Sequence, residues 1–534
     1  MKTTIKNLIL SAVLVVGGAS CVDLDTAPYD RETDSTYWEE DPEAAVKALN
    51  TCYTYLGNMD EQLYCEAMTD NAYTKQPNDF TQNIGNGSYS TADSYVKQVW
   101  DGRYTGIRMC NQLLENIDRV PDLDPELKKR YIGEAKVLRA YSYYELYTKF
   151  GDIPYTTKVL SIKESMSIAR TAKATVIVNI LADLDEVING NYLPTSYDAD
   201  NKGRITRWAA MAIKAKIYLF EGNWTQVKNI TSTIMTEGGF KLFGSYAGLF
   251  EIANEYNSEV ILDAQYRPTS REHQMMYVFL PPTLGGYSQL SPLQELVDSY
   301  IMLDGKTIKE TGTSFDESHP YANRDPRLKA TVMYTGNSYT LADGTEVVIN
   351  CEKGEGKDGY GVGSDCSATG YYIKKYWDNT YRATLYSGLN PILIRYADIL
   401  LMNAEALAEL GELDKTAWDA TIKPIRNRAG FTLASALEFP EGASKDKLIE
   451  IVRNERRSEL ALEGHRHKDI IRWRIADNVL NGWCHGLKTN DVVGTDDGYV
   501  RVENRTFNAN RHYLWPIPQA ERDLNGNLEQ NPNW

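Results

Sequence analysis

The stretch GEAKVLRAYSYYELYTKFG, residues 133–151, has the pattern of a long helix that packs against other helices. Its stripe residues are Ala135, Leu138, Tyr141, Tyr144 and Tyr147. They recur every three positions, close to the spacing of side chains on one face of a helix. The glycine that closes the stretch suits a helix end, because glycine readily takes the left-handed conformation there. The stretch therefore predicts a helix that ends at Gly151.

Two further segments close in the same way, AKIYLFEG at 215–222 and AEALAELG at 404–411. The alanines inside them would let a neighbouring helix approach closely. Gly151 and Gly222 lie 71 residues apart, which is close to two tetratricopeptide units of about 34 residues each. The full consensus of that repeat is absent. We predict a mainly α fold in which tetratricopeptide-like helix hairpins form a scaffold.

Helical patterning covers about residues 36–240 and 391–534, and a region of different character lies between them, at about 243–390. There, paired prolines and glycines, frequent tyrosines and short β-rich runs such as 345–350 replace the helical spacing. We predict an irregular, loop-rich region with small β elements there, within the segment 21–534. Loops on a rigid scaffold often carry binding residues, so we expect the ligand-binding surface there.

The composition excludes one class of partner. The 534 residues include 57 Lys and Arg against 73 Asp and Glu, a net charge of −16. A nucleic-acid-binding protein needs a basic face, so no nucleic-acid partner is expected. The 36 tyrosines and 10 tryptophans far outnumber the 11 phenylalanines. Most aromatic rings therefore carry a polar group, which suits surfaces that are partly wet.

The first twenty residues have the features of an export signal. Lys2 and Lys6 precede an apolar run that is too short to span a bilayer, for which about 20 apolar residues are needed. The run is followed by Gly18-Ala19-Ser20-Cys21, which resembles a bacterial lipobox, with Gly18 where Leu or Val is usual. We predict a signal peptide over residues 1–20 and a lipid on Cys21 that anchors the mature protein stably. The alternative is a cleaved signal peptide that leaves Cys21 unmodified.

No complete pattern for catalysis, a metal or a cofactor occurs in the sequence. The six histidines supply no zinc pattern, and the spacings of a dinucleotide site, a P-loop and an EF-hand are each incomplete or out of context. We therefore expect no metal and no cofactor, whereas carboxylate pairs for glycoside hydrolysis stay open at this point, because 73 acidic residues offer many such pairs. Cys351 and Cys366 flank a glycine-rich stretch and could join in a disulfide.

Several long segments carry a family resemblance. They are 133–141 with 150–154, 203–218 with 222–224, 395–406, 426–430, 454–460, 463–466, 469–473, 514–518 and 530–532. In the same order along the chain, they resemble the motifs of the SusD-like (RagB/SusD) family of Bacteroidetes, whose members are nutrient-binding lipoproteins of the outer membrane.

The resemblance implies an α-rich domain with four tetratricopeptide-like hairpins and a variable ligand surface. It implies a glycan ligand, with peptides as the alternative, and no catalysis. It also implies a SusC-like TonB-dependent transporter as partner, which the lipid-anchored protein would cover on the extracellular side of the outer membrane. Two readings from other classes remain open: an exported glycoside hydrolase and a scaffold that binds a protein tail.

Glycan binding needs flat aromatic faces against the C–H faces of sugars, and polar groups for the hydroxyls. We looked for both in two irregular stretches, 70–100 and the loop-rich region. The expected ligand-binding residues are Asn71, Tyr73, Asp79, Tyr89, Tyr95, Trp100, Tyr287, Gln289, Tyr300, Arg324, Tyr376 and Trp377. Trp100 also begins an apolar helical stripe, which is equally consistent with a place in the core.

The charged motifs near the C-terminus have a structural interpretation. The residues Arg456, Arg457, Glu459, Glu463 and Arg466 lie at three- and four-residue spacings on a helix predicted over 447–473. Such spacing permits ion pairs within the helix and leaves guanidinium groups for carboxylates elsewhere. We predict that these residues and Glu405 stabilise the fold and do not bind the ligand.

Overall fold

The structure is a computed structural model that describes residues 33–75, 80–381 and 384–534. The predicted signal peptide, the predicted lipidation site Cys21 and the predicted ligand contact Asp79 lie outside these ranges. Among the described helices, none combines the length and the apolar character needed to cross a membrane.

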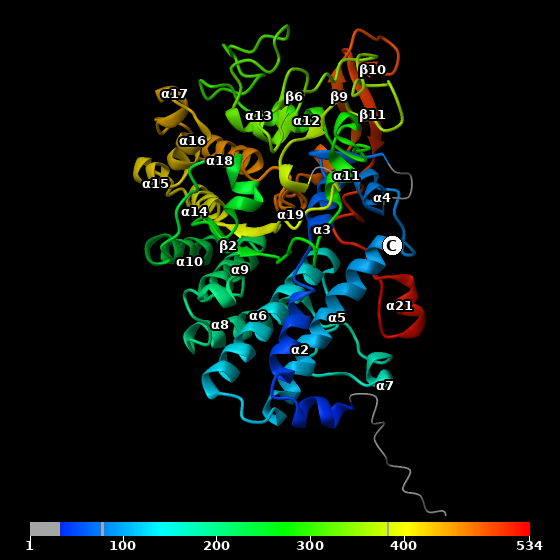
Figure 1. The fold of residues 1–534 in the computed structure, drawn as a ribbon, viewed down its shortest axis with the longest axis vertical. Helices are drawn as coiled ribbons and strands as arrows, with labels where there is room; N and C mark the ends of the chain where they lie inside the picture. Colours follow the sequence, from blue (N-terminus) through cyan, green and yellow to red (C-terminus); the bar gives the residue numbers. More distant parts are fainter. Residues whose placement is uncertain (1–32, 76–79, 382–383) are drawn as a thin grey trace, which may run out of the picture.

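Long helices form the lower and middle parts of the molecule in Figure 1. They are α2 (Ala44–Tyr53), α5 (Ser94–Asn116), α6 (Pro125–Phe150), α8 (Lys173–Asn189), α9 (Arg207–Phe220), α10 (Trp224–Glu237), α14 (Tyr396–Leu410) and α18 (Lys445–Glu459). From α5 onward each of these helices packs on the next, so that consecutive antiparallel hairpins build one curved array. This arrangement confirms the predicted mainly α scaffold of tetratricopeptide-like hairpins.

The glycines that were predicted to end helices do so. Gly151, Gly222 and Gly411 have φ angles of 72°, 70° and 74°, and each follows the end of its helix directly or by one residue. In the helix that the opening stretch predicted, Tyr144 and Tyr147 are 3% and 1% exposed and pack against neighbouring helices. These tyrosines serve the core.

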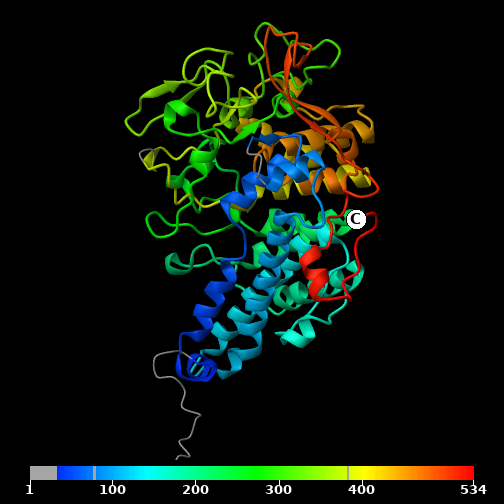
Figure 2. The same cartoon turned by 90° about the vertical axis from the view of Figure 1, so that its right-hand side faces the viewer.

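The loop-rich region leaves the array after α10 and returns at α14, and these two helices pack against each other. It lies at the upper end of the molecule in Figures 1 and 2. Its short helices are η5 (Gly248–Phe250), η6 (Ile252–Asn254), α11 (Met275–Phe279), η7 (Pro282–Leu284), α12 (Gln294–Ser299), α13 (Pro326–Thr331) and η8 (Asn379–Tyr381). The predicted irregular region with small β elements is therefore present.

The strands form small antiparallel sheets. The pairs are β1 (Ala72–Thr74) with β3 (Leu290–Pro292), β2 (Val260–Asp263) with β8 (Ile392–Arg395), β4 (Val332–Met333) with β7 (Tyr372–Ile373), β5 (Ser338–Thr340) with β6 (Glu346–Val348), and β11 (Tyr499–Arg505) with both β9 (Gly482–Lys488) and β10 (Thr495–Asp496). The β1–β3 pair joins the 70–100 stretch to the loop-rich region, two parts that are far apart in the sequence.

The remaining short elements precede, separate or follow the long helices. They are η1 (Thr36–Glu40), α3 (Met59–Tyr64), η2 (Cys65–Met68), α4 (Phe80–Asn86), η3 (Ile117–Arg119), α7 (Ile162–Ser165), η4 (Ala199–Asn201), α15 (Lys415–Ala420), α16 (Ile422–Ala429), α17 (Ala434–Leu437), α19 (Arg466–Arg472), α20 (Ala476–Val479) and α21 (Gln519–Leu524).

The prediction of a single helix over 447–473 is wrong. The segment forms two helices, α18 and α19, separated by a turn in which Leu462 and Gly464 have φ angles of 63° and 78°. The turn directs the carboxylate of Glu463 to the guanidinium of Arg395, at 2.7 Å. Long-range pairing of a buried charge therefore overrides the local helical spacing.

The predicted structural role of the charged motifs is confirmed, although the partners are not on the same helix. Arg456 bonds to Asp398 at 2.5 Å and to Asp469 at 2.8 Å. Glu405 accepts two hydrogen bonds of 2.6 Å from Arg472. All five side chains are buried or nearly so, and the pairs connect α14, α18 and α19.

The two cysteines that flank the glycine-rich stretch do not form a disulfide in this structure. Cys351 and Cys366 are both buried free thiols. Burial raises the pKa of the Cys351 thiol well above its usual value, so this group stays protonated at neutral pH.

Candidate functional site

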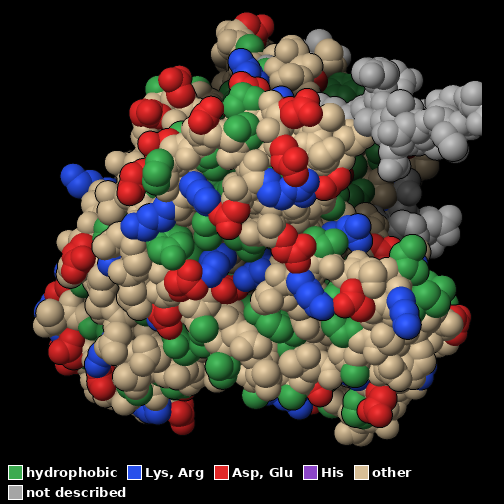
Figure 3. All heavy atoms as spheres, turned by 90° about the horizontal axis from the view of Figure 1, so that it is seen from below, with side chains coloured by type: hydrophobic (Ala, Val, Ile, Leu, Met, Phe, Trp, Pro, Cys, Tyr) green, Lys and Arg blue, Asp and Glu red, His purple; other side chains and the backbone are tan. Residues whose placement is uncertain are grey.

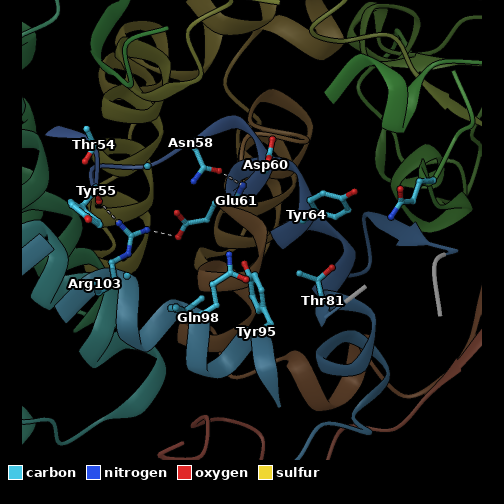
Figure 4. A pocket seen from close by; sticks show the side chains of 14 residues that line it. Thr54, Tyr55, Asn58, Asp60, Glu61, Tyr64, Thr81, Tyr95, Gln98 and Arg103 are labelled. Atoms are coloured by element: carbon cyan, nitrogen blue, oxygen red, sulfur yellow. Dashed lines mark hydrogen bonds and ion pairs between the residues drawn. The ribbon is translucent and has the colours of Figure 1, made fainter. Parts of the chain in front are cut away.

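A pocket of about 460 Å³ opens between α3, α4 and the first half of α5 (Figure 4). Its lining residues are Thr54, Tyr55, Gly57, Asn58, Asp60, Glu61, Tyr64, Thr81, Tyr95, Gln98, Val99, Gly102, Arg103 and Gln289. They come from three separate parts of the chain, and the β1–β3 pair brings the third part, at Gln289, to the other two. The volume lies in the range of small-molecule sites.

Helix α5 supplies one wall of the pocket. Its N-cap Asp93 accepts hydrogen bonds from the backbone N–H groups of Tyr95 and Val96 at 3.0 and 3.4 Å, which fixes the start of the helix. Tyr95, Gln98 and Gly102 then follow at helical spacing and face the pocket. A side chain at Gly102 would meet no atom within 4 Å, so this glycine adds to the open space.

The segment between α2 and α3 supplies the opposite wall. Asn58 caps α3, because its side-chain oxygen accepts a hydrogen bond from the N–H of Glu61 at 2.7 Å. Arg103, on α5, donates to the backbone oxygen of Tyr55 at 2.8 Å and forms an ion pair with Glu61. Figure 4 shows both contacts crossing the pocket floor. They hold the two walls at a fixed separation.

The charge of Arg103 is secure in this position. Burial by itself lowers the pKa of the guanidinium, but the carboxylates of Glu61 and Glu145 raise it above its ordinary value. Arg103 therefore remains a cation, and Glu61 balances its charge at the pocket floor.

The chemistry of the lining is mixed. Three partly exposed tyrosine rings, of Tyr55, Tyr64 and Tyr95, lie around the pocket. Between them lie the exposed amides of Asn58 and Gln98, which can both donate and accept hydrogen bonds. This combination suits a ligand that has apolar faces and many hydroxyl or amide groups at its edges.

Two of the residues expected from the sequence, Tyr95 and Gln289, line this pocket. Three more are partly exposed elsewhere. Tyr73, on β1, accepts a hydrogen bond from Gln82 of α4 at 3.4 Å. The ring of Tyr287 lies 6.3 Å from that of Tyr277.

Trp377 is the third of these partly exposed residues. Its ring nitrogen donates to the backbone oxygen of Thr340 at 2.8 Å, and its ring packs edge-on against Tyr339 at 5.4 Å. It does not line the pocket.

Six other expected contacts are buried, which corrects the expectation that they lie on the surface. They are Asn71, Tyr89, Trp100, Tyr300, Arg324 and Tyr376, at 1%, 4%, 4%, 0%, 6% and 3% exposure. Each is held by the interior. Trp100 packs against the rings of Tyr104 and Phe150 at 4.8 and 5.0 Å, which confirms its alternative place in the core.

The polar members of this buried group bond within the protein. Arg324 donates to the backbone oxygens of Val297 and Tyr300 at 2.6 and 2.8 Å. Asn71 accepts from Arg457 at 2.9 Å.

The two buried tyrosines Tyr376 and Tyr89 are fixed by neighbours as well. The hydroxyl of Tyr376 donates to the backbone oxygen of Leu462 at 3.0 Å. The ring of Tyr89 packs against those of His512 and Trp534, at 5.2 and 4.7 Å. These contacts leave only 3% of Tyr376 and 4% of Tyr89 exposed.

Sequence reasoning missed most of the pocket. Tyr55, Tyr64 and Arg103 lie in or beside helices, outside the two irregular stretches from which contacts were expected, and Gln98 lies within 70–100 but was not among the expected residues. One signal was available: Gly57-Asn58 interrupts the helical pattern, which marks a break where side chains become accessible.

Within the described ranges, no group of three or more His, Cys, Asp or Glu side chains is arranged to hold a metal ion.

Comparison with known proteins agrees with the architecture. The SusD-like protein P25 of Formosa agariphila is 27% identical over 516 residues, which cover 89% of this chain and 91% of that protein. The crystal structure of a SusD-like carbohydrate-binding protein from Bacteroides fragilis superposes with a TM-score of 0.81 at 27% identity and covers 92% of this chain and 100% of that one. A second SusD-like protein from the same organism gives a TM-score of 0.80 at 27% identity, with coverage of 95% and 100%.

Family models match both halves of the chain. One, described as starch-binding associating with outer membrane, matches residues 29–219. The model of the SusD family matches residues 249–534, which is more than half of the sequence. The fold, the order of the motifs and these matches agree, and the chain belongs to the SusD family.

Proposed function

We propose that this protein is a non-catalytic lipoprotein on the extracellular face of the outer membrane, which binds a glycan and delivers it to a SusC-like TonB-dependent transporter. The observation that carries the proposal is the pocket, in which Tyr55, Tyr64 and Tyr95 surround the amides of Asn58 and Gln98. The SusD-like relative from B. fragilis, described as carbohydrate-binding, supports the same ligand class.

The physical fit is between the rings and the two kinds of sugar surface. The C–H face of a pyranose is apolar and gains from contact with an aromatic ring, whose electron-rich face also attracts the C–H hydrogens. Sugar hydroxyls both donate and accept hydrogen bonds, and amide side chains match both roles. Peptide, which also offers apolar groups and amides, is the alternative ligand.

The first described residues and the pocket lie at opposite ends of α5. The first described residues are tied to the end of this helix, since Arg119 pairs with Asp34 and Glu39 at 2.8 and 2.9 Å. The pocket lies along the first half of α5, whose 23 residues extend about 34 Å. The part of the chain that the structure describes therefore begins at the end of α5 that lies away from the pocket.

The surface at that end suits attachment through a lipid. Seen from below in Figure 3, hydrophobic side chains lie singly or in small groups among acidic and basic ones. A mixed surface of this kind would not insert into a bilayer by itself, so the proposed anchoring rests on the acyl chains.

The proposal is tested with purified protein that begins after Cys21. A panel of polysaccharides, oligosaccharides and peptides is screened by microarray, and hits are measured by isothermal titration calorimetry. We expect glycan binding that weakens in Tyr95→Ala and Gln98→Ala but not in Tyr386→Ala, a matched exposed tyrosine outside the pocket. Binding of peptides alone would support the alternative, and release of reducing ends from a polysaccharide would overturn the non-catalytic assignment.

A further inference from the structure

A second cavity, of about 80 Å³, lies directly behind the pocket. The two share five lining residues: Gly57, Asn58, Glu61, Tyr95 and Arg103. The Glu61–Arg103 ion pair therefore lies between an outer pocket and an inner cavity. A water molecule needs roughly 10–15 Å³ of such volume, so the inner cavity has room for several waters or for one compact charged group.

The walls of the inner cavity carry more positive than negative charge. Four cationic side chains line it, those of Arg103, Lys149, Lys216 and Lys468. Three carboxylates line it, those of Glu61, Glu145 and Glu463. The lining thus has one positive charge in excess, in a part of the protein that is largely removed from water.

The positive charge in excess can be assigned to particular side chains. Lys216 is balanced by Asp398 at 2.7 Å. Glu145, by contrast, forms ion pairs with both Lys149 and Lys468, at 2.8 and 2.9 Å, so a single carboxylate neutralises only one of two ammonium groups.

The other charged side chains that line the cavity have partners of opposite charge. Arg103 pairs with Glu61, and Glu463 bonds to Arg395 and Lys375, at 2.7 and 2.8 Å. The unbalanced charge is therefore that of the Lys149–Lys468 pair. The Lys149 and Lys468 side chains are 10% and 23% exposed, so water screens this charge only in part, and a bound anion would compensate it.

A neutral donor lies beside these lysines. His467 lines the same cavity, and burial together with Lys149 and Lys468 lowers the pKa of its imidazole to about 3. Its ring is partly exposed and lies 6.2 Å from that of Trp515. A neutral imidazole keeps one N–H, which can donate to an anion next to the ammonium groups.

We propose that the inner cavity is an oxyanion subsite, in which Lys149, Lys468 and His467 bind a carboxylate or sulfate group. This inference rests on the proposed function in one respect: the group would be a substituent of an acidic glycan whose chain lies in the outer pocket. A free inorganic anion has the same chemistry and is the other source.

The test compares ligands that differ only in charge. Acidic glycans that bind in the screen are measured by calorimetry beside their methyl-esterified or desulfated forms, and sodium sulfate is titrated separately. The wild-type protein should bind the charged form at least about 10-fold more tightly than the neutral form, as expected for a charge-assisted hydrogen bond.

Two variants should act in opposite directions. Lys468→Met removes one ammonium group from a partly exposed side chain and should abolish the preference for the charged form, while Glu145→Gln frees both ammonium groups and should retain or strengthen anion binding. Lys415→Met, which removes an exposed lysine on α15, is the matched control and should change nothing. Thermal unfolding verifies that each variant is folded.

The outcomes separate the two proposals. Sulfate binding that is lost in Lys468→Met, without any glycan binding, would leave the subsite standing for a free anion and would count against the proposed function. Glycan binding that is indifferent to ligand charge and to Lys468→Met, together with no sulfate binding, would overturn the subsite and leave the proposed function intact.

Discussion

Arg395 and Glu463 form a two-point ion pair inside the protein, in which Nε and Nη2 of the arginine donate to the two carboxylate oxygens at 2.7 Å each. Both side chains are 1% exposed. Arg395 ends β8, where the loop-rich region returns to the helical array, and Glu463 lies in the turn between α18 and α19. The pair therefore fastens the loop-rich region to the late helices.

Loss of one partner of this pair should destabilise the protein strongly. We expect Glu463→Gln to lower the free energy of unfolding by about 3–5 kcal/mol, because it leaves the buried charge of Arg395 with less compensation. The measurement is urea denaturation followed by circular dichroism. Arg119→Met, which breaks an exposed pair, is the control and should cost less than about 1 kcal/mol. Equal losses in the two variants would contradict the prediction.

Two glycines should respond to alanine with opposite signs. Gly411 has a φ angle of 74° and no atom within 4 Å of an added Cβ, so only backbone strain opposes Gly411→Ala. We expect a loss of about 1–2 kcal/mol. Gly102 lies inside α5, where an added Cβ would also meet no atom within 4 Å, and its φ angle is not positive. Gly102→Ala should therefore raise the unfolding free energy by about 0.5–1 kcal/mol. A loss of stability in both variants would show that the space at Gly102 is not available.

Tyr95 and Trp100 lie five residues apart on one helix and should separate ligand binding from folding. Tyr95→Ala should weaken glycan binding with little change in the unfolding temperature, because its ring lines the pocket. Trp100→Ala should cost about 3–5 kcal/mol of stability, since it removes a ring that is 4% exposed. Calorimetry and thermal denaturation on the same samples measure both effects. A Trp100→Ala variant of unchanged stability would contradict the structural assignment.

The histidine beside the inner cavity should make stability depend on pH. The pKa of His467 is lowered to about 3 in the folded protein by burial and by Lys149 and Lys468, against an ordinary value near 6.5. Between these values the unfolded chain binds a proton that the folded chain does not bind, so this residue causes a loss of stability as pH falls from about 6.5 toward 3.

We therefore expect His467→Gln to show a smaller loss of stability between pH 7 and pH 5 than the wild-type protein does. Removal of a neighbouring cation in Lys468→Met should also raise the pKa of His467, measured by NMR from its ring C–H signals. A wild-type imidazole that titrates near 6.5 would contradict both expectations.

The helical scaffold could be predicted from the sequence because its determinants are local. The stripe along residues 133–151 and the glycine that closes it depend only on neighbours in the same helix. The pocket could not be predicted in this way. Arg103 and Glu61 are 42 residues apart, and Gln289 reaches the same pocket only through a strand pair. Similarly, nothing in the sequence distinguishes Tyr95 from Tyr300. In the structure, Tyr95 lines the pocket and Tyr300 is fully buried.

The sequence by itself determined the mainly α hairpin array, the helix ends at Gly151, Gly222 and Gly411, and the place of the loop-rich region, because side-chain periodicity and glycine conformation act over a few residues. Only the tertiary structure decided which tyrosines face solvent and which carboxylate each buried arginine meets. Arg457 and Asn71, for example, bond across 386 residues. Burial and charge compensation are properties of the packed interior, and they are set by residues that become neighbours only when the chain has folded.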